Sequence, residues 1–402
     1  MHIDLNSCFA MVEQQANPLL RNKPVAVAAY ATSSGCILAA SYEAKRLGVK
    51  TGMRVKEGRL LCPSLIVLPP DAPKYRDVHL KLRKVLSSYT NDFVPRSIDE
   101  FVLNLKDYPV SAKGMTNIGL EIKKRIKKEV GDYLTVSVGI STNRFLAKTA
   151  CSLHKPDGLE EINKDNFESV FSKLNLVDLC GIKARNASRL MGMGIYSVSQ
   201  FYDSPIWKLK AAFSSIAGYY WWVRLHGFEI DDVEWGRRSY GNSYSLPKPF
   251  KSPKDLSPIL AKLSEKTGFR LRKAGYKVQG VHLALLFKDH TYWHKGLKLP
   301  HPIFDSRDIF KTAFRLMCKS PLPKPVANIA VSCFNLTKKD TLQLNLFENI
   351  EKKKELVSAV DNINKRWGHF VVAQGGMLET SDYVPDRIAF GGVKELEEIT
   401  TD

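Results

Sequence analysis

Two adjacent carboxylates, Asp99 and Glu100, are the residues most able to do chemistry. They lie between Pro95 and the apolar run 101–103. Alternation along a strand would send them to opposite faces. At a strand end or a hairpin turn, however, the backbone twists and both side chains can converge on one point. An ordinary hairpin with acids at its turn would give the same pattern, since acidic turn residues are common.

A third carboxylate, Asp4, ends a short apolar stretch at the start of the chain. On its own an aspartate at such a place carries little information. Three carboxylates on adjacent strand ends, in contrast, would supply the hard oxygen ligands that Mg²⁺ requires. Phosphoryl transfer depends on such ions for charge stabilisation and alignment.

The bulk composition indicates a globular protein with a polyanionic partner. The chain has 402 residues, enough for two to four domains, and a net charge of +19. It contains no apolar run long enough to cross a membrane and no secretory signal. Its seven cysteines are scattered and form no CxxC pair. This usage favours a reducing compartment and a cytoplasmic location, and it argues against a zinc site.

Periodicity predicts an α+β protein built from two separate layouts. In the first, helical apolar spacing covers 75–89 and 118–130, on either side of the acidic hairpin, and a β-prone run follows at 134–140. This order is typical of a ferredoxin-like domain. The second layout reads β-α-β-β-α-β, with strands at 237–246, 277–287, 292–299 and 325–334 and helices at 258–273 and 305–319.

Two features point to nucleic acid as the polyanion. Residues 243–335 contain 17 Lys and Arg against 5 Asp and Glu, which favours a domain that follows a phosphate backbone. Residues 179–195 look like a helix-hairpin-helix, in which a turn at Gly181 presents backbone N–H groups to a DNA phosphate. Lys183 stands where such hairpins usually have a second glycine. Packing between two helices would explain the Gly181-Ile182 pair equally well.

Together, Asp4 and the Ser97-Ile98-Asp99-Glu100 motif resemble the metal-binding core of Y-family DNA polymerases, the lesion-bypass enzymes. The resemblance extends from Ile3 to about Phe347 and keeps the order and spacing of several motifs. It implies a right-hand polymerase with a ferredoxin-like palm, small fingers, a helical thumb and a β-α-β-β-α-β little finger. The implied domains are palm 1–10 and 73–162, fingers 11–72, thumb 163–232, linker 233–242, little finger 243–337, and a clamp-binding peptide with a tail at 338–402.

The resemblance also implies roles for single residues at the reaction centre. Asp4 and Asp99 would bridge two Mg²⁺ ions, Glu100 would hold the catalytic ion beside the primer 3′-OH, and the carbonyl of Leu5 would add a ligand. Phe9 matches the steric gate that excludes a ribose 2′-OH, although a core position is the commoner fate of a phenylalanine. Asn6 stands where many members have Asp, and activity is expected to survive this difference.

Further residues would contact the substrates and a partner. The nucleotide triphosphate should meet Tyr42, Lys155 and either Lys45, where Arg is common, or its neighbour Arg46. Expected DNA contacts are Gly181, Lys183, Arg237 and Arg238. Gln343-Leu344-Asn345-Leu346-Phe347 resembles the peptide that binds the bacterial sliding clamp, with Gln343, Leu344, Leu346 and Phe347 as its contact residues.

The expected function is therefore template-directed, low-fidelity DNA synthesis past lesions, without proofreading, from dNTPs on primer–template DNA. The chain is expected to be monomeric on its own and to have no membrane partner. One alternative is a DNA-binding scaffold that has lost catalysis, but such a chain would show substitutions at Asp4, Asp99 or Glu100. Another is a nucleotidyl cyclase, which would need neither the helix-hairpin-helix nor the basic domain.

Overall fold

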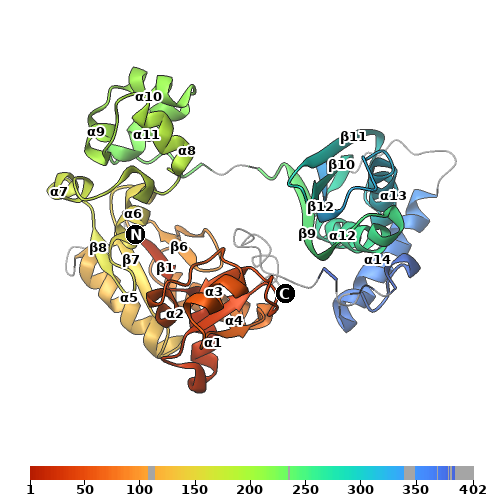
Figure 1. The fold of residues 1–402 in the computed structure, drawn as a ribbon, viewed down its shortest axis with the longest axis horizontal. Helices are drawn as coiled ribbons and strands as arrows, with labels where there is room; N and C mark the ends of the chain where they lie inside the picture. The colour runs from red at the N-terminus through yellow and green to blue at the C-terminus, as the bar shows by residue number, and fades with distance from the viewer. Residues whose placement is uncertain are drawn as a thin grey trace. The chain divides into compact units, whose positions relative to one another are not determined.

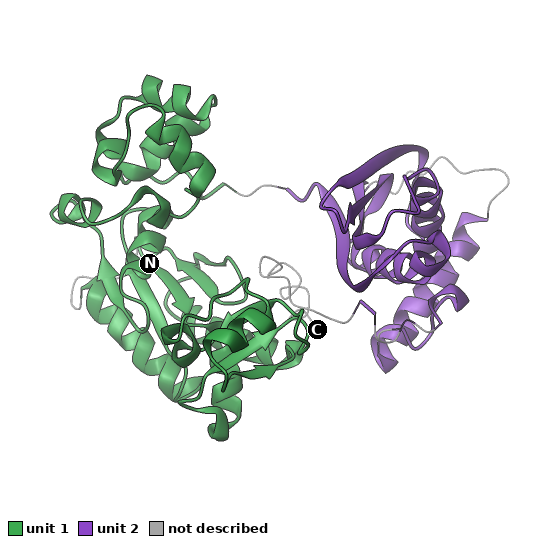
Figure 2. Cartoon of the chain, viewed as in Figure 1, with its two compact units in different colours: residues 1–233, 387–402 green, residues 234–386 purple. Residues whose placement is uncertain are grey.

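The computed structural model describes residues 1–106, 114–233, 236–338, 349–368, 370–378, 380 and 383–384. The chain divides into two compact units, one formed by residues 1–233 and the other lying within residues 234–386 (Figure 2). The expected clamp peptide, Gln343–Phe347, lies outside the described residues.

The first unit is built around a five-stranded sheet of order β5-β6-β1-β7-β8 (Figure 1). Its strands are β1 (His2–Leu5), β5 (Phe93–Pro95), β6 (Glu100–Leu103), β7 (Val136–Ile140) and β8 (Leu159–Glu161). β1 is central and runs antiparallel to both β6 and β7. This is the ferredoxin-like arrangement that the helix–hairpin–helix–strand order predicted, with β8 added parallel to β7.

Three helices of this unit pack on or near the sheet: α4 (Ala72–Leu86), α5 (Met115–Glu129) and α6 (Arg144–Leu153). α4 packs against α5, and α6 contacts β1, β7 and β8. The apolar residues of α4 and α5 form one core with Ile3 and Leu5 of β1. Because side chains alternate along a strand, His2 and Asp4 lie on the other face of β1.

A second, three-stranded sheet in the first unit has the order β3-β2-β4, with strands β2 (Val25–Ala28), β3 (Ile37–Ala40) and β4 (Ile66–Leu68). Around it lie α1 (Cys8–Ala16), α2 (Tyr42–Arg46), α3 (Val55–Leu61) and a 3₁₀ turn, η1 (Pro18–Leu20). Ser41 caps α2 by accepting the N–H of Ala44. This cap fixes the start of the helix that carries Tyr42 and Lys45.

The rest of the first unit is helical. It comprises α7 (Phe167–Phe171), the 3₁₀ turn η3 (Leu176–Asp178), α8 (Ala184–Met191), α9 (Val198–Asp203), α10 (Ile206–Phe213) and α11 (Ala217–Leu225). Their apolar residues form a core of their own, which also takes in Phe145 and Leu146 of α6.

The second unit confirms the predicted β-α-β-β-α-β order. β9 (Ser239–Phe250), α12 (Pro253–Lys273), β10 (Lys277–Phe287), β11 (Tyr292–Ile303), α13 (Ser306–Met317) and β12 (Val326–Thr337) follow one another. The sheet order is β11-β10-β12-β9, and every neighbouring pair is antiparallel. β9 begins at Ser239, so the end of the expected linker 233–242 belongs to this strand.

The described part of the tail packs on the second unit. α14 (Ile350–Trp367) and the 3₁₀ turn η4 (Gly375–Met377) carry the buried residues Val357 and Met377. The side chain of Lys262 on α12 is buried, and its Nζ donates to the carbonyl oxygens of Thr380 and Tyr383 at 2.6 and 2.5 Å. The described part of the tail therefore belongs to this unit.

All seven cysteines are free thiols, as their spacing predicted. Within the described ranges, none of the helices is both long enough and apolar enough to cross a bilayer.

Candidate active site

Strand pairing brings the predicted carboxylates together at the end of β1. Asp4 is the direct antiparallel partner of Glu100, and the N–H of Leu5 donates to the carbonyl oxygen of Asp99 at 2.8 Å. The expected convergence at a strand end is therefore present, although Asp99 precedes the first residue of β6. His2, two residues before Asp4, lies on the same face of β1.

His2, Asp4 and Glu100 form a potential metal-binding group. Each offers a ligand atom within 4.8 Å of those of the other two. The side chains of Asp4 and Glu100 are 14% and 21% exposed, so a small cation can reach them. Their oxygen atoms are the donors that Mg²⁺ prefers, and the donor set thus fits the expected ion.

Asp99 lies beside this group but points its carboxylate at a different partner. Its Oδ1 accepts a hydrogen bond from the hydroxyl of Ser97. Burial, together with the nearby charges of Asp4 and Glu100 and against the hydrogen bond from Ser97, raises the pKa of Asp99 to about 6. Burial also raises the pKa of Asp4, against the opposing effect of Lys155. Carboxylates crowded in this way repel one another electrostatically, and a bound cation relieves part of this repulsion.

Two lysines already neutralise these carboxylates. Nζ of Lys148, on α6, lies 2.8 and 2.6 Å from the two oxygens of Glu100. Nζ of Lys155 lies 2.7 Å from Oδ2 of Asp4. Lys155 was an expected triphosphate contact, whereas Lys148 was not foreseen, because no local pattern indicates a contact between residues 48 positions apart.

The expected nucleotide residues gather next to Asp4. Nζ of Lys45 donates to Oγ of Ser7 at 2.7 Å and lies 4.6 Å from the ring centre of Tyr42. Lys45 also experiences the charges of Lys155 and Asp4, and burial is the main cause of its lowered pKa. Lys45 and Arg46 are both exposed, so the contacts of Lys45 with Ser7 and Tyr42 are what distinguish it from Arg46. The geometry therefore favours Lys45 over Arg46 as the residue that faces a triphosphate.

Phe9 is fully enclosed, with only 2% of its surface exposed. Its ring stacks on that of Tyr75 at 4.3 Å between centroids and 13° between planes. The hydroxyl of Tyr75 donates to Glu13, which also accepts from Lys74. Phe9 thus has a fixed position, and both the gate and the core interpretation are compatible with it.

The side chain of Asn6 links neighbouring segments by hydrogen bonds, and Asn6 is not one of the expected metal ligands. Its Oδ1 accepts the N–H of Asp157 at 2.8 Å and the hydroxyl of Thr135 at 3.1 Å, and its Nδ2 donates to Oγ of Ser137 at 2.9 Å. These bonds tie β1 to β7 and to the loop that follows Lys155. A neutral side chain at this position completes the network without adding a fourth negative charge.

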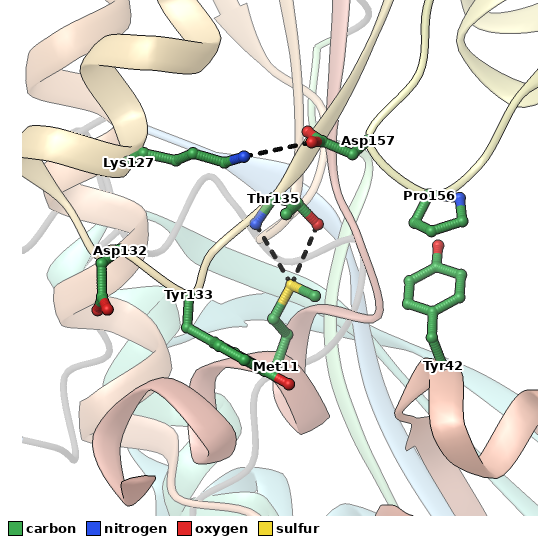
Figure 3. Close-up of a pocket in the computed structure, with 8 residues that line it drawn as sticks. All are labelled: Met11, Tyr42, Lys127, Asp132, Tyr133, Thr135, Pro156 and Asp157. Carbon is green, nitrogen blue, oxygen red and sulfur yellow. Dashed lines mark hydrogen bonds and ion pairs between the residues drawn. The ribbon is translucent and has the colours of Figure 1, made fainter. Parts of the chain in front are cut away.

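A pocket of about 290 Å³ lies beside the nucleotide residues rather than at the carboxylates. Figure 3 shows Lys127 joined to Asp157 on one side and Thr135 bonded to Sδ of Met11 below. The full lining is Met11, Tyr42, Lys127, Asp132, Tyr133, Thr135, Pro156 and Asp157. None of the expected metal ligands lines it.

The expected hairpin forms between η3 and α8. Gly181 has a φ of +92°, a backbone conformation that favours glycine. A Cβ at this position, as in any other residue, would also lie only 3.3 Å from the side chain of Trp221. Gly181 and Lys183 are both exposed, so both are free to meet a phosphate. The first helix of a helix-hairpin-helix is reduced here to the short 3₁₀ turn.

The other expected contacts lie beyond this centre. In the second unit, the guanidinium carbon of Arg237 lies 3.9 Å from the ring centre of Tyr240, and Arg238 is exposed. Gln343, Leu344, Leu346 and Phe347 are outside the described residues, so their expected role stays a prediction.

The residue missed at the carboxylates is His2. It is 2% exposed, and neither ring nitrogen has a hydrogen-bond partner among the described residues. Burial and the charge of Lys148 lower its pKa to about 3. Strand alternation could have located it, since residues two apart on a strand share a face.

The chain is similar to known proteins over nearly its whole length. Residues 3–152 match the impB/mucB/samB family, and residues 237–346 match the C-terminal domain of the same family. DNA polymerase IV 1 of Bacillus subtilis is 30% identical over 95% of this chain and 93% of its own length. DNA polymerase IV of Pelotomaculum thermopropionicum is 30% identical over 96% of each chain.

Solved structures give the same result. A chimeric Y-family DNA polymerase superposes with a TM-score of 0.73 and 25% identity, covering 84% of this chain and 99% of that one. A ternary insertion complex of Dbh DNA polymerase superposes with a TM-score of 0.56 and the same identity and coverage.

Proposed function

The chain belongs to the impB/mucB/samB family of Y-family polymerases and is a translesion DNA polymerase, and from this premise we propose that Asp4, Asp99 and Glu100 are its catalytic carboxylates. The observation that carries the proposal is the pairing of Asp4 with Glu100 across β1 and β6. The carbonyl of Leu5 completes the proposed ligand set. The scaffold alternative lacks support, because none of the three carboxylates is replaced.

We further propose two Mg²⁺ ions as the cofactor, held by these carboxylates. When bound, the ions would stabilise charge on the transferring phosphoryl group. Tyr42, Lys45 and Lys155 bind and orient the triphosphate, with Lys155 leaving Asp4 to do so. Lysine suits this exchange because its ammonium is a single compact charge without a fixed fork.

The experiment that tests this assignment is primer extension by the full chain with Glu100→Ala. We expect extension to fall by about a thousandfold or more, since metal ligation supplies several kcal/mol of transition-state stabilisation. Affinity for primer–template should stay within a few-fold. Asp77→Ala, which removes an exposed carboxylate paired with Lys81 on α4, is the control and should extend normally. Substantial extension by Glu100→Ala would overturn the assignment.

We propose Phe9 as the steric gate, held in place by Tyr75. Their stacking distance of 4.3 Å fixes the ring, so a substrate with a 2′-OH cannot push it aside. Phe9→Ala should reduce the discrimination between dNTPs and rNTPs by about ten- to a hundredfold, the usual value of such a steric contact. Tyr75→Phe keeps the stack and should retain the discrimination. An unchanged ratio in Phe9→Ala would leave Phe9 as a core residue only.

For DNA, we propose two contact regions: Gly181 with Lys183, and the sheet of the second unit together with Arg237 and Arg238. One face of that sheet carries small side chains in register, because Ser243 pairs with Ala330 and Gly241 with Ser332. A flat face of this kind lets a phosphate backbone approach closely. The basic excess of residues 243–335 supports the same assignment.

The DNA contacts can be tested through salt dependence. Replacing the exposed residues Arg238, Lys248, Lys251 and Lys298 by Gln should make log K against log[salt] shallower by about 2 to 4, since each neutralised phosphate contributes about 0.9. The matched control changes four exposed basic residues of α14, namely Lys352, Lys354, Lys365 and Arg366. Equal slopes for the two variants would show that the sheet does not face DNA.

The remaining assignments complete the proposal. The domain boundaries are those expected from the sequence, except that the little finger begins with β9 at Ser239 and includes the described tail. Gln343–Phe347 is proposed to bind the bacterial sliding clamp, and the protein is proposed to act in the cytoplasm as a monomer. Its relatives are named as DNA polymerases, and this supports a role in DNA synthesis on the chromosome.

A further inference from the structure

The geometry points to His2 as a nitrogen ligand in the metal site of this polymerase, so that the site binds a transition-metal dication such as Mn²⁺ more tightly than an all-oxygen site would. The inference deepens the proposed function and rests on metal binding by Asp4 and Glu100. Three ligand atoms, one from each of His2, Asp4 and Glu100, lie within 4.8 Å of one another.

The position of His2 is the first argument. It shares a face of β1 with Asp4, and its Nε2 lies 3.9 Å from Oε2 of Glu100. A single ion can bind donors at such separations after small side-chain movements. Two carboxylates and one imidazole make a mixed oxygen and nitrogen donor set.

The second argument is the cost of leaving His2 as it stands. The residue is 2% exposed, and both ring nitrogens are without a hydrogen-bond partner among the described residues. A buried polar group without a partner is unfavourable, and native structures rarely keep one without a reason. Coordination of an ion would satisfy one of these nitrogens.

His79 shows what a structural histidine looks like in the same core. It is also buried, and its Nε2 likewise has no partner among the described residues, but its Nδ1 lies 2.9 Å from the carbonyl oxygen of Ile98 and its ring stacks on Phe101 at 5.0 Å. Its surroundings account for its orientation, whereas no comparable contact orients His2. His79 therefore serves as the matched control.

The chemical consequence is a change in ion preference. Imidazole binds transition-metal ions well, whereas Mg²⁺ prefers carboxylate and water oxygens. Removal of His2 should therefore reduce affinity for Mn²⁺ much more than affinity for Mg²⁺. The loss for Mn²⁺ is expected to be about tenfold or more.

The test is pulsed electron paramagnetic resonance of Mn²⁺ bound to the full chain without DNA or nucleotide. The exposed pair His282 and His294, whose nitrogens are 3.2 Å apart, could bind Mn²⁺ on its own. All variants therefore carry His282→Ala and His294→Ala. We expect an imidazole nitrogen coupling that changes when the histidines are labelled with the heavier nitrogen isotope, disappears in His2→Leu and persists in His79→Leu.

Different outcomes separate this inference from the proposed function. Mn²⁺ binding that is lost in Glu100→Ala but shows no imidazole coupling overturns the role of His2 and leaves the carboxylate site intact. Mn²⁺ binding that is unaffected by Glu100→Ala overturns both. If His2→Leu does not fold, His2→Gln replaces it, and the spectrum of the protein that carries only His282→Ala and His294→Ala decides whether imidazole is a ligand.

Discussion

The two units hold partly buried carboxylates in opposite ways. In the first, Glu100 and Asp4 are each neutralised by one lysine, Lys148 and Lys155. In the second, the guanidinium of Arg272 makes two bonds of 2.7 Å to Asp361. A lysine ammonium is a point charge that can leave, whereas an arginine fork fixes both partners.

The surroundings of Arg272 and Lys148 also differ. The side chain of Arg272 is 12% exposed, and it also reaches Glu265, the carbonyl oxygen of Phe304 and Oγ of Ser306. Lys148 is 33% exposed and has Glu100 as its carboxylate partner. One arrangement holds α14 onto α12, and the other neutralises the carboxylates that we propose as metal ligands. If that proposal holds, the exchangeable lysine pairs serve catalysis and the arginine pair serves architecture.

The largest expected effect concerns the forked pair. Arg272→Met should lower the free energy of unfolding of the second unit by about 2–3 kcal/mol, because the partly buried Asp361 is left without its partner. Hydrogen exchange of the amides of α12, followed over a series of urea concentrations, measures it. The double variant Arg272→Met with Asp361→Leu should recover most of the loss. A change below about 1 kcal/mol would mean that the pair is not structural.

A smaller effect should follow when Lys148, whose ammonium can leave Glu100, is replaced by an arginine that binds as Arg272 does. Lys148→Arg should weaken apparent Mg²⁺ affinity by up to about tenfold, because a bidentate guanidinium releases Glu100 less readily. Lys148→Met should strengthen it by about two- to fivefold, since no ammonium competes for a partly exposed carboxylate. Calorimetric Mg²⁺ titration measures both. Changes in the same direction would break the comparison.

Much of the fold was predictable from the sequence because its pattern is local. The strand 277–287 was predicted with the bounds that β10 has, since its buried residues alternate with partly exposed ones. The pairing of Asp4 with Glu100 required the family resemblance, because strand partners 96 positions apart leave no local signal.

What escaped prediction depends on distant contacts. Lys148 reaches Glu100 across the sheet, and Lys262 binds carbonyl oxygens of the tail more than a hundred residues away. Neither lysine differs in sequence from a solvated surface lysine. His2 is the exception: the period of two on β1 places it beside Asp4, and only its burial was missing from the sequence.

The anchored tail determines how a pulling load would pass through the protein. Residues 339–348 run between β12 and α14, and both elements belong to the second unit. A partner that held Gln343–Phe347 would therefore pull on two attachment points at once. β12 resists through its hydrogen bonds to β10 and β9, and α14 resists through Arg272. A load applied at these residues would therefore be shared by the sheet and by α14.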